Sequence, residues 1–232
     1  MEERQPELSV VGRARGPVGG VALVLHGGSE FSSAAVRPWR LAYLRMLPFA
    51  IALSRSGAWH GLDVRLLRNR VRGWNEPAMD PLADARWALD RIRAERPGVP
   101  VVLVGHSLGG RVALRAADDP AVVGACALAP WTPQGEPVEP VAGRAVLIAH
   151  GTHDRVTSPV ESLRYAEEAD PKAARLARFE VAAEGHAMLR RPSLWNRLVV
   201  TFVLRTLGLP DSGQVLDAAW ESAAPARFRL PL

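Results

Sequence analysis

An apolar run that ends in a glycine-flanked serine constrains the fold of this chain more than any other segment. Residues 101–104 are Val, Val, Leu and Val, the composition of a strand buried in a parallel sheet. The pattern Gly105-x-Ser107-x-Gly109 follows, and residues 111–117 then suit a helix. Because glycine has no Cβ, strand and helix can approach closely while Ser107 takes a strained conformation. The sequence therefore predicts a strand, an exposed nucleophile and a helix.

Two later strands end in residues that would complete a catalytic serine site. Five-residue matches occur by chance, so an ordinary glycine–serine turn is the alternative for this motif taken alone. Asp154 follows an apolar strand at 145–150, however, and His186 follows a short one at 176–182. Because the carboxyl ends of parallel strands meet at one edge of a sheet, the order Ser, Asp, His predicts a triad of Ser107, Asp154 and His186.

Four ordered motifs resemble those of the α/β-hydrolase superfamily and together cover most of the chain. They are Leu25-His26-Gly27-Gly28-Ser29, Gly105-His106-Ser107-Leu108-Gly109, Gly151-Thr152-His153-Asp154 and Glu184-Gly185-His186. The resemblance implies an α/β fold with a mostly parallel, twisted sheet, helices on both faces and an active site beyond the strand ends. The small size is similar to that of dienelactone-hydrolase-like and carboxylesterase-like members. Dienelactone hydrolases carry cysteine as nucleophile, where this chain has Ser107.

The chemistry of the three candidate residues predicts their roles. His186 is expected to take the Ser107 proton during attack and to return it to the leaving group. Asp154 is expected to hold the imidazole in the productive tautomer and to stabilise its protonated form. Asp170 is the only other aspartate between Asp154 and His186, but it precedes a proline after a helical run, which suits a turn.

Two backbone amides are the candidates for an oxyanion hole. Leu108 would begin the helix after the nucleophile, where its amide has no intrahelical partner and the helix dipole favours negative charge. The resemblance places the second donor in the loop after the strand at 21–26, at Gly28, with Gly27 and Ser29 as alternatives. A simple tight turn is the other interpretation of these glycines.

No metal or organic cofactor is expected. Four histidines gather near the predicted strand ends, but their spacing does not suit a zinc site. They are His26, His106, His150 and His153. The resemblance explains His26 and His106 as structural positions.

Length and composition are consistent with one catalytic domain over residues 1–232. The chain has 232 residues, of which 48% are hydrophobic, enough for a substantial core. Its single cysteine, Cys126, lies in an apolar run, so a buried strand thiol is expected. The first seven residues lack the apolar core of a signal peptide, and no run approaches a membrane span. A cytoplasmic protein that neither spans a membrane nor binds nucleic acid is expected.

The net charge of +5 does not by itself identify a partner. Basic residues are mostly scattered beside acidic ones, a pattern typical of solvated helix faces rather than of a nucleic-acid or membrane surface. The densest group, made of Arg65, Arg68, Arg70 and Arg72, is a candidate for a positive rim that attracts acidic substrates.

Hydrophobic patterns predict alternating strands and helices, as in successive βαβ units. Strands are expected near 8–14, 21–26, 62–68, 101–105, 122–129, 145–150 and 176–182. Helices are expected at 33–56, disturbed at Pro48, and at 80–96, 107–117, 158–169 and 192–207. Residues 209–232 are interpreted as a tail with at most one short helix. Within 33–56, Trp39, Tyr43, Leu47 and Ala50 recur on one face, mainly a core face, although Phe31 or Trp39 is a candidate partial lid.

The loop after the strand near 122–129 is too short for a cap domain. Residues 131–143 are rich in proline, so a fairly rigid loop and an open pocket are expected. Trp131 in this loop and Trp74 after another strand are candidate walls of the substrate pocket, with core packing as the alternative.

These features predict a serine hydrolase that cleaves a small-molecule carboxylic ester or thioester through an acyl-enzyme. An acyltransferase or peptidase with the same triad, and a ligand-binding protein without catalysis, are the alternatives. The acyl chain and leaving group depend on pocket dimensions that loops determine.

Overall fold

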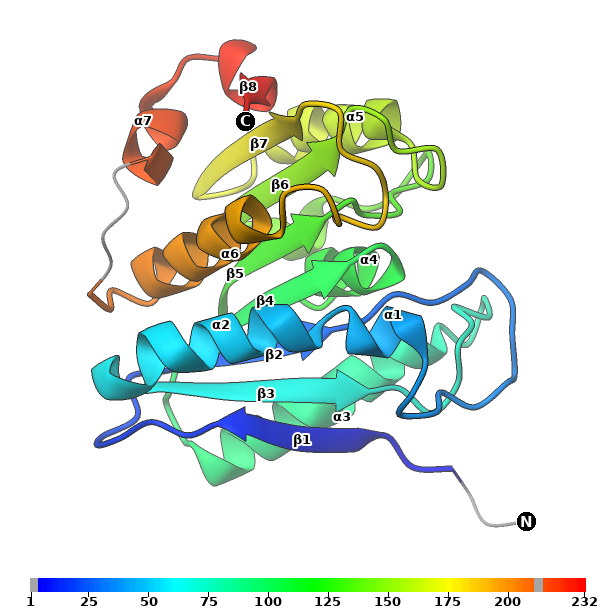
Figure 1. Ribbon diagram of the computed structural model, residues 1–232, viewed down its shortest axis with the longest axis vertical. Helices are drawn as coiled ribbons and strands as arrows, with labels where there is room; N and C mark the ends of the chain where they lie inside the picture. The colour runs from blue at the N-terminus through cyan, green and yellow to red at the C-terminus, as the bar shows by residue number, and fades with distance from the viewer. Residues whose placement is uncertain (1–3, 211–214) are drawn as a thin grey trace.

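The computed structural model describes residues 4–210 and 215–232, so residues 1–3 and 211–214 of the expected domain and tail lie outside the described residues. Eight strands form one sheet in the order β1-β3-β2-β4-β5-β6-β7-β8 (Figure 1). Only β1 is antiparallel to its neighbour. The strands are β1 (Glu7–Gly12), β2 (Gly20–Leu25), β3 (Leu62–Arg68), β4 (Val101–His106), β5 (Val122–Leu128), β6 (Ala145–Gly151), β7 (Arg175–Val181) and β8 (Leu230–Pro231).

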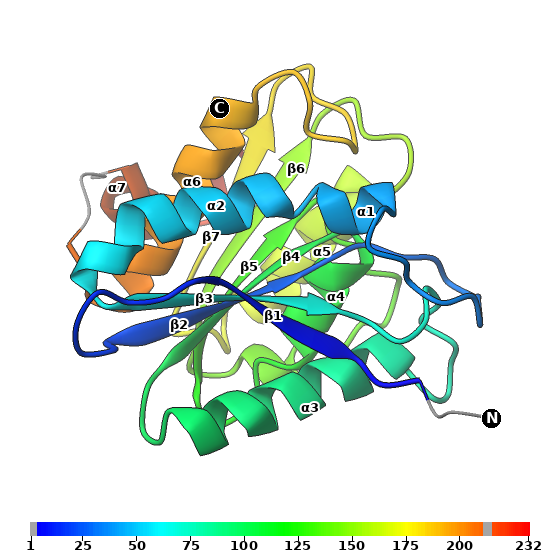
Figure 2. The same cartoon turned by 60° about the horizontal axis from the view of Figure 1, so that its bottom comes forward.

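Helices cover both faces of the sheet (Figures 1 and 2). They are α1 (Leu41–Leu44), α2 (Leu47–Gly57), α3 (Asp80–Glu95), α4 (Leu108–Arg115), α5 (Pro159–Ala169), α6 (Pro192–Thr206) and α7 (Val215–Glu221). Because successive side chains of a strand point to opposite faces, Leu23 packs in the core under α3, α4 and α5, while Val24 packs under α2 and α6. The predicted α/β class, with a mostly parallel sheet and helices on both faces, is confirmed.

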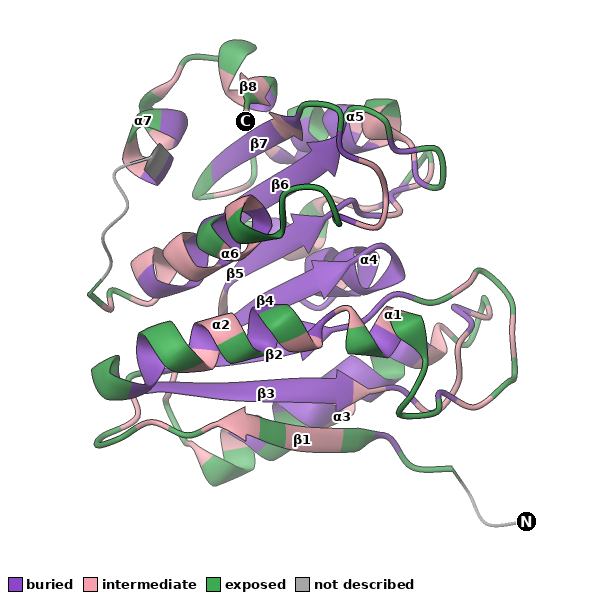
Figure 3. Cartoon of the chain, in the orientation of Figure 1, coloured by how far each residue is buried: buried purple, intermediate pink, exposed green. Residues whose placement is uncertain are grey.

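The central strands are buried along their whole length (Figure 3). All residues of β2, β4 and β6 are buried, which explains why these strands are continuous apolar runs rather than alternating ones. Cys126 on β5 is fully buried, as predicted, and burial raises the pKa of its thiol well above the usual range. None of the helices in the described ranges has the length and apolar character needed to cross a bilayer.

All seven predicted strands are present, with ends shifted by no more than two residues. The eighth strand, β8, was not expected, because the two residues that pair with β7 carry no strand pattern of their own. The short helix expected in the tail corresponds to α7, and β8 anchors the end of the tail to the sheet.

The predicted helix at 33–56 is wrong over its first part. Residues 33–40 are not helical, because their backbone bonds to the loop after β3 instead. The Arg72 amide donates to Ala34 O over 3.0 Å, and the Val36 amide donates to Arg70 O over 3.4 Å. Trp39, expected on a core face, is therefore 70% exposed, whereas Tyr43 and Ala50 further along are buried as expected.

Candidate active site

Ser107 lies in a sharp turn between β4 and α4. Its φ of 58° and ψ of −120° belong to a region that non-glycine residues rarely occupy. Glycine is required on both sides: a Cβ on Gly105 would lie 2.0 Å from Gly109 O, and one on Gly109 would lie 2.4 Å from Leu25 O. The strand–turn–helix arrangement predicted around Ser107 is therefore present.

Asp154 and His186 lie in the loops after β6 and β7 and contact each other. His186 Nδ1 is 2.8 Å from Asp154 Oδ2. The other carboxylate oxygen, Oδ1, accepts the amides of Val156 and Thr157 over 2.8 and 3.0 Å. Burial alone would raise the pKa of the Asp154 carboxyl, but these hydrogen bonds, with one from His150, hold that pKa well below its usual range. Asp154 is therefore a carboxylate at neutral pH.

Two residues not singled out as partners of Asp154 also bind it. His150 Nε2, on fully buried β6, lies 3.2 Å from Asp154 Oδ2. Thr157 Oγ1 lies 3.0 Å from the same oxygen, 3.2 Å from His186 Nδ1 and 3.1 Å from Ala129 O. Burial lowers the pKa of His150, against the opposing influence of Asp154, so His150 is a neutral donor. Thr157 follows Asp154 by three residues, and this short spacing is the feature of the sequence that hints at the network.

Glu184 fixes the loop that carries His186. Its buried carboxylate accepts the amide of Arg191 over 3.0 Å and the Trp195 indole N–H over 3.2 Å. The loop between β7 and α6 is thus tied to the start of α6 from inside. A glutamate two residues before the candidate base was part of the recognised motif, but its structural role follows only from these contacts.

His106 brings the His186 loop against the turn at Ser107. Its Nε2 lies 2.9 Å from His186 O, and the two imidazole rings are 4.7 Å apart between centroids. Burial and the neighbouring His186 lower the pKa of His106 to about 3. His106 directly precedes Ser107 in the sequence, so its neutral imidazole holds the backbone of His186 close to the serine turn.

The remaining histidines do not gather into a metal-binding group. The imidazole of His26 is buried and its Nε2 accepts the Asn69 amide over 3.1 Å, while His153 is exposed. In the parts of the chain that the structure describes, no group of three or more His, Cys, Asp or Glu side chains could hold a metal ion.

The candidate oxyanion donors lie against the nucleophile with their amides unused. The Ser29 amide donates to Arg72 O over 2.9 Å, which removes Ser29 from the alternatives. The amides of Gly27, Gly28 and Leu108 make no hydrogen bond to any described residue. A Cβ on Gly27 would lie 3.3 Å from Ser107 Cβ, so this loop passes directly over the serine.

Ser107 and His186 do not form a hydrogen bond with each other in this structure. The Ser107 side chain is largely buried, at 9% exposed for the residue, and its hydroxyl has no partner among the described residues. Catalytic hydrogen bonds of free enzymes are often long and tighten when substrate binds. The triad therefore remains a prediction that the placement of its members supports.

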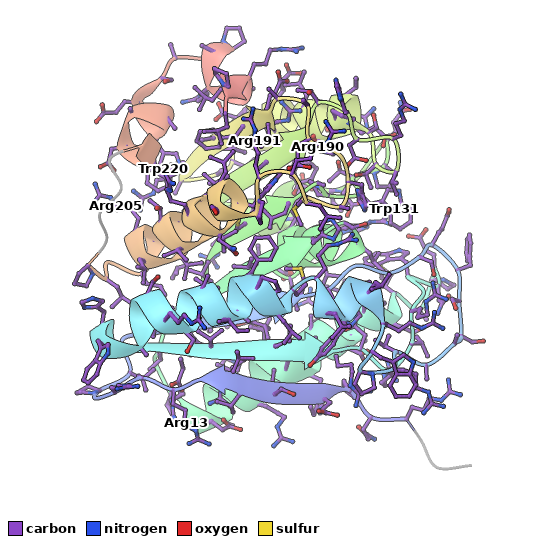
Figure 4. The ribbon with its side chains drawn as sticks, in the orientation of Figure 1. Arg13, Trp131, Arg190, Arg191, Arg205 and Trp220 are labelled. Atoms are coloured by element: carbon purple, nitrogen blue, oxygen red, sulfur yellow. The ribbon has the colours of Figure 1, made fainter. Side chains whose placement is uncertain are left out.

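Trp74 and Trp131, the predicted pocket walls, border one cavity of about 290 Å³. The Arg111 guanidinium lies between them, 4.1 Å from the ring centre of Trp74 and 4.5 Å from that of Trp131. Figure 4 shows Trp131 at the carboxyl end of the sheet. Trp74 is also 1% exposed and belongs to the core, which agrees with the alternative of core packing, and its role as a wall of the substrate pocket stays a prediction. Phe31 borders this cavity as well, and its role as a lid stays a prediction.

The expected positive rim of four arginines is wrong for three of them. Arg65 pairs with Asp63 and Glu95, Arg68 with Glu7, and Arg70 with Asp80 and Asp84. Arg72 alone of the four has no ion pair with a residue that the structure describes, and it borders a cavity of about 330 Å³ over Gly27 and Gly28. The three paired arginines thus link β3 and the loop after it to β1 and α3. Asp170 caps α5 and pairs with Arg227, in agreement with its interpretation as a turn residue.

Comparisons with known proteins agree with this fold. A family model described as the alpha/beta hydrolase family matches residues 22–231. No curated protein matches the sequence. XC6422 from Xanthomonas campestris, an α/β serine hydrolase without a lid, is 18% identical with a TM-score of 0.64, over 90% of this chain and 91% of that chain.

Two esterases of known structure are similar as well. Est1E from Butyrivibrio proteoclasticus, with ferulic acid bound, is 13% identical with a TM-score of 0.66, over 88% of this chain and 96% of that chain. The propionate-bound thermophilic esterase Est2 from Thermogutta terrifontis is 17% identical with a TM-score of 0.65, over 90% and 92%. At these identities the likeness shows a shared fold, with no large cap domain.

Proposed function

Because the chain belongs to the α/β hydrolase family, we propose that it is a serine hydrolase that cleaves a carboxylic ester or thioester through an acyl-enzyme. One observation carries the proposal: Ser107 occupies a strained turn at the start of α4, beside a loop whose His186 binds Asp154 over 2.8 Å. These groups are what nucleophilic acyl transfer needs.

In the proposed first step, Ser107 Oγ attacks the carbonyl carbon of the substrate. His186 Nε2 accepts the hydroxyl proton and then gives it to the leaving alcohol or thiol. Asp154 keeps the proton of the neutral imidazole on Nδ1 and stabilises the imidazolium that forms. Water then attacks the acyl-enzyme: His186 Nε2 takes a proton from the water and gives it to Ser107 Oγ as the acid is released.

Two unused amides would stabilise the negative oxygen of the tetrahedral intermediate. Leu108 and Gly28 are the proposed donors, with Gly27 as the alternative for the second. Each such donor is worth about 2.7 to 4 kcal/mol of transition-state stabilisation. Both are backbone groups, so they are fixed before the substrate arrives.

An ester substrate is supported by the structural neighbours. Two of the neighbours are esterases, and one is a serine hydrolase without a lid. The cavity bordered by Trp74 and Trp131 is proposed to accept part of the substrate, since aromatic side chains bind acyl or aryl groups well.

Covalent labelling tests the proposal directly. A fluorophosphonate is expected to add once to the protein, as seen by intact mass, and p-nitrophenyl esters are expected to be hydrolysed. Ser107→Ala should lose both properties, whereas the control Ser29→Ala should keep both, because the Ser29 hydroxyl donates only to Phe31 O over 3.4 Å and its backbone amide is kept. No adduct and no turnover with the unchanged protein would contradict the proposal.

A further inference from the structure

The mouth of the candidate site is bordered on one side by exposed apolar side chains and unpaired arginines. We define the α1 rim as Trp39, Leu41 and Leu189 together with Arg40, Arg190 and Arg191. Trp39, Leu41 and Leu189 are 70%, 76% and 74% exposed. Side chains of this size are normally exposed singly, so three of them beside one opening require an explanation.

Two cavities connect the members of the α1 rim to each other and to the site. The first, about 330 Å³, is bordered by Gly27, Gly28, Trp39, Arg40 and Leu41. The second, about 360 Å³, is bordered by Leu41 and Leu44 of α1 on one side and by Met188 and Leu189 on the other. Leu41 borders both, so the rim runs from the candidate oxyanion loop to the segment after His186.

The two segments that form the α1 rim carry positive charges and no negative ones. Residues 31–49 contain three arginines and no acid, and residues 185–197 contain three more and no acid. Among the described residues, Arg40, Arg190 and Arg191 form no ion pair and no side-chain hydrogen bond. Arginines in the body of the protein, such as Arg65 and Arg178, are buried and paired. Glu30 and Glu76 border the cavity of Trp74 and Trp131 instead.

We propose that the α1 rim docks the protein on an anionic lipid surface, with the mouth of the site facing the lipid. Exposed tryptophan and leucine side chains enter the boundary between head groups and acyl chains, as in peripheral proteins. The unpaired arginines bind the phosphates of anionic lipids, which arginine does well with its planar guanidinium. A nucleic-acid surface would supply phosphates but no apolar layer for Trp39, Leu41 and Leu189.

The docking goes beyond the proposed hydrolysis and does not depend on it. Its consequence for the reaction is that an ester dissolved in the lipid reaches Ser107 without passing through water. Because binding needs no turnover, Ser107→Ala should bind vesicles as tightly as the unchanged protein.

Vesicle binding with matched arginine variants tests the proposal. The full chain should bind vesicles that contain about one third phosphatidylglycerol and should not bind pure phosphatidylcholine vesicles, with binding weakened by salt. Arg190→Gln/Arg191→Gln should weaken binding by roughly thirtyfold, on the basis of the usual contribution of each arginine near an anionic surface. Their amides still bind Glu184, so turnover of a dissolved short-chain ester should be unchanged.

Arg13→Gln/Arg15→Gln is the control, because it removes the same charge elsewhere. Both arginines are exposed, and Figure 4 shows Arg13 on the side of the molecule away from Arg190 and Arg191. For the apolar part, Trp39→Ser should weaken binding and Trp59→Ser should not, although Trp59 is 69% exposed. Absence of binding to anionic vesicles, equal losses in the two arginine variants, or full displacement by RNA would each overturn the proposal.

Discussion

The two sides of Ser107 are built differently. We call the side of Ser107 that carries Asp154 and His186 the acid side. There, Asp154 is enclosed by His186, His150, Thr157 and the backbone, and both carboxylate oxygens are bound. We call the side that carries the candidate oxyanion donors the donor side. There, the amides of Gly28 and Leu108 form no hydrogen bond with a residue that the structure describes, and the neighbouring α1 rim is exposed. The acid side is complete before substrate arrives, whereas the donor side is left for the substrate to complete. Changes on the two sides should therefore differ in kind and in size.

Asp154→Asn should produce the largest effect on the acid side. An amide in place of the carboxylate favours the wrong tautomer of His186 and cannot stabilise the imidazolium, so kcat should fall by about 10⁴. Steady-state hydrolysis of a p-nitrophenyl ester measures this loss. The fold should be kept, as seen by circular dichroism, because asparagine occupies nearly the same volume.

Asp170→Asn is the matched control for this change. Asp170 pairs with Arg227 at the end of α5, away from His186, so its neutralisation should leave kcat unchanged. If Asp154→Asn and Asp170→Asn had similar activities, Asp154 would not be the orienting acid.

On the donor side, Gly28→Ala should lower kcat by about 10² to 10³, the cost of a lost oxyanion donor. A Cβ at Gly28 would lie 2.3 Å from Arg72 O and 2.5 Å from Leu108 Cδ2, so the loop must move. Comparison of kcat with KM on short esters measures the effect, with KM expected to change little. Gly19→Ala, at the amino end of β2, would meet a leucine methyl group at 3.2 Å and should not affect kcat.

The serine turn and the order of the three candidate residues were predictable because they depend on local rules. Gly105 and Gly109 have contacts that exclude any Cβ, and such contacts leave a pattern in the sequence. The same holds for the buried strands, whose apolar runs follow from burial on both faces.

The donor side was harder to predict because its conformation depends on distant partners. Residues 33–40 carry apolar residues at helical spacing, yet their backbone pairs with residues 70–73, which no local pattern shows.

The network on Asp154 could not be predicted for a related reason. His150 and Thr157 reach one carboxylate oxygen only through the turn of the loop after β6.

Acid should destabilise the protein through histidines that are buried on both sides of the site. Burial lowers the pKa of His26 to about 4 and that of His106 to about 3, below the usual value near 6.5. The folded state thus binds fewer protons than the unfolded state, so stability is present above the unfolded pKa and is lost as the pH falls.

The expected loss is about 2 kcal/mol for each of these histidines between pH 7 and pH 5. Urea unfolding at both pH values measures it. In His26→Asn, the dependence on pH should be smaller by that amount, whatever the stability at pH 7. An unchanged dependence would mean that the pKa of His26 is the same in the folded and the unfolded protein.

Thr157→Val should give the smallest effect and tests how complete the acid side is. Its hydroxyl lies 3.0 Å from Asp154 Oδ2 and 3.2 Å from His186 Nδ1, so valine removes one polar group from this cluster at nearly constant volume. A hydrogen bond to a charged group contributes about 1.5 kcal/mol or more, which corresponds to a loss of roughly tenfold in kcat/KM. Ser158→Ala is the control, because Ser158 Oγ caps α5 by accepting the Glu161 amide and does not touch Asp154. The cap variant should lose about 1 kcal/mol of stability and keep its kcat/KM. If Thr157→Val lost stability without losing kcat/KM, His150 and His186 would be sufficient to orient the carboxylate, and the two sides of Ser107 would differ less than their contacts indicate.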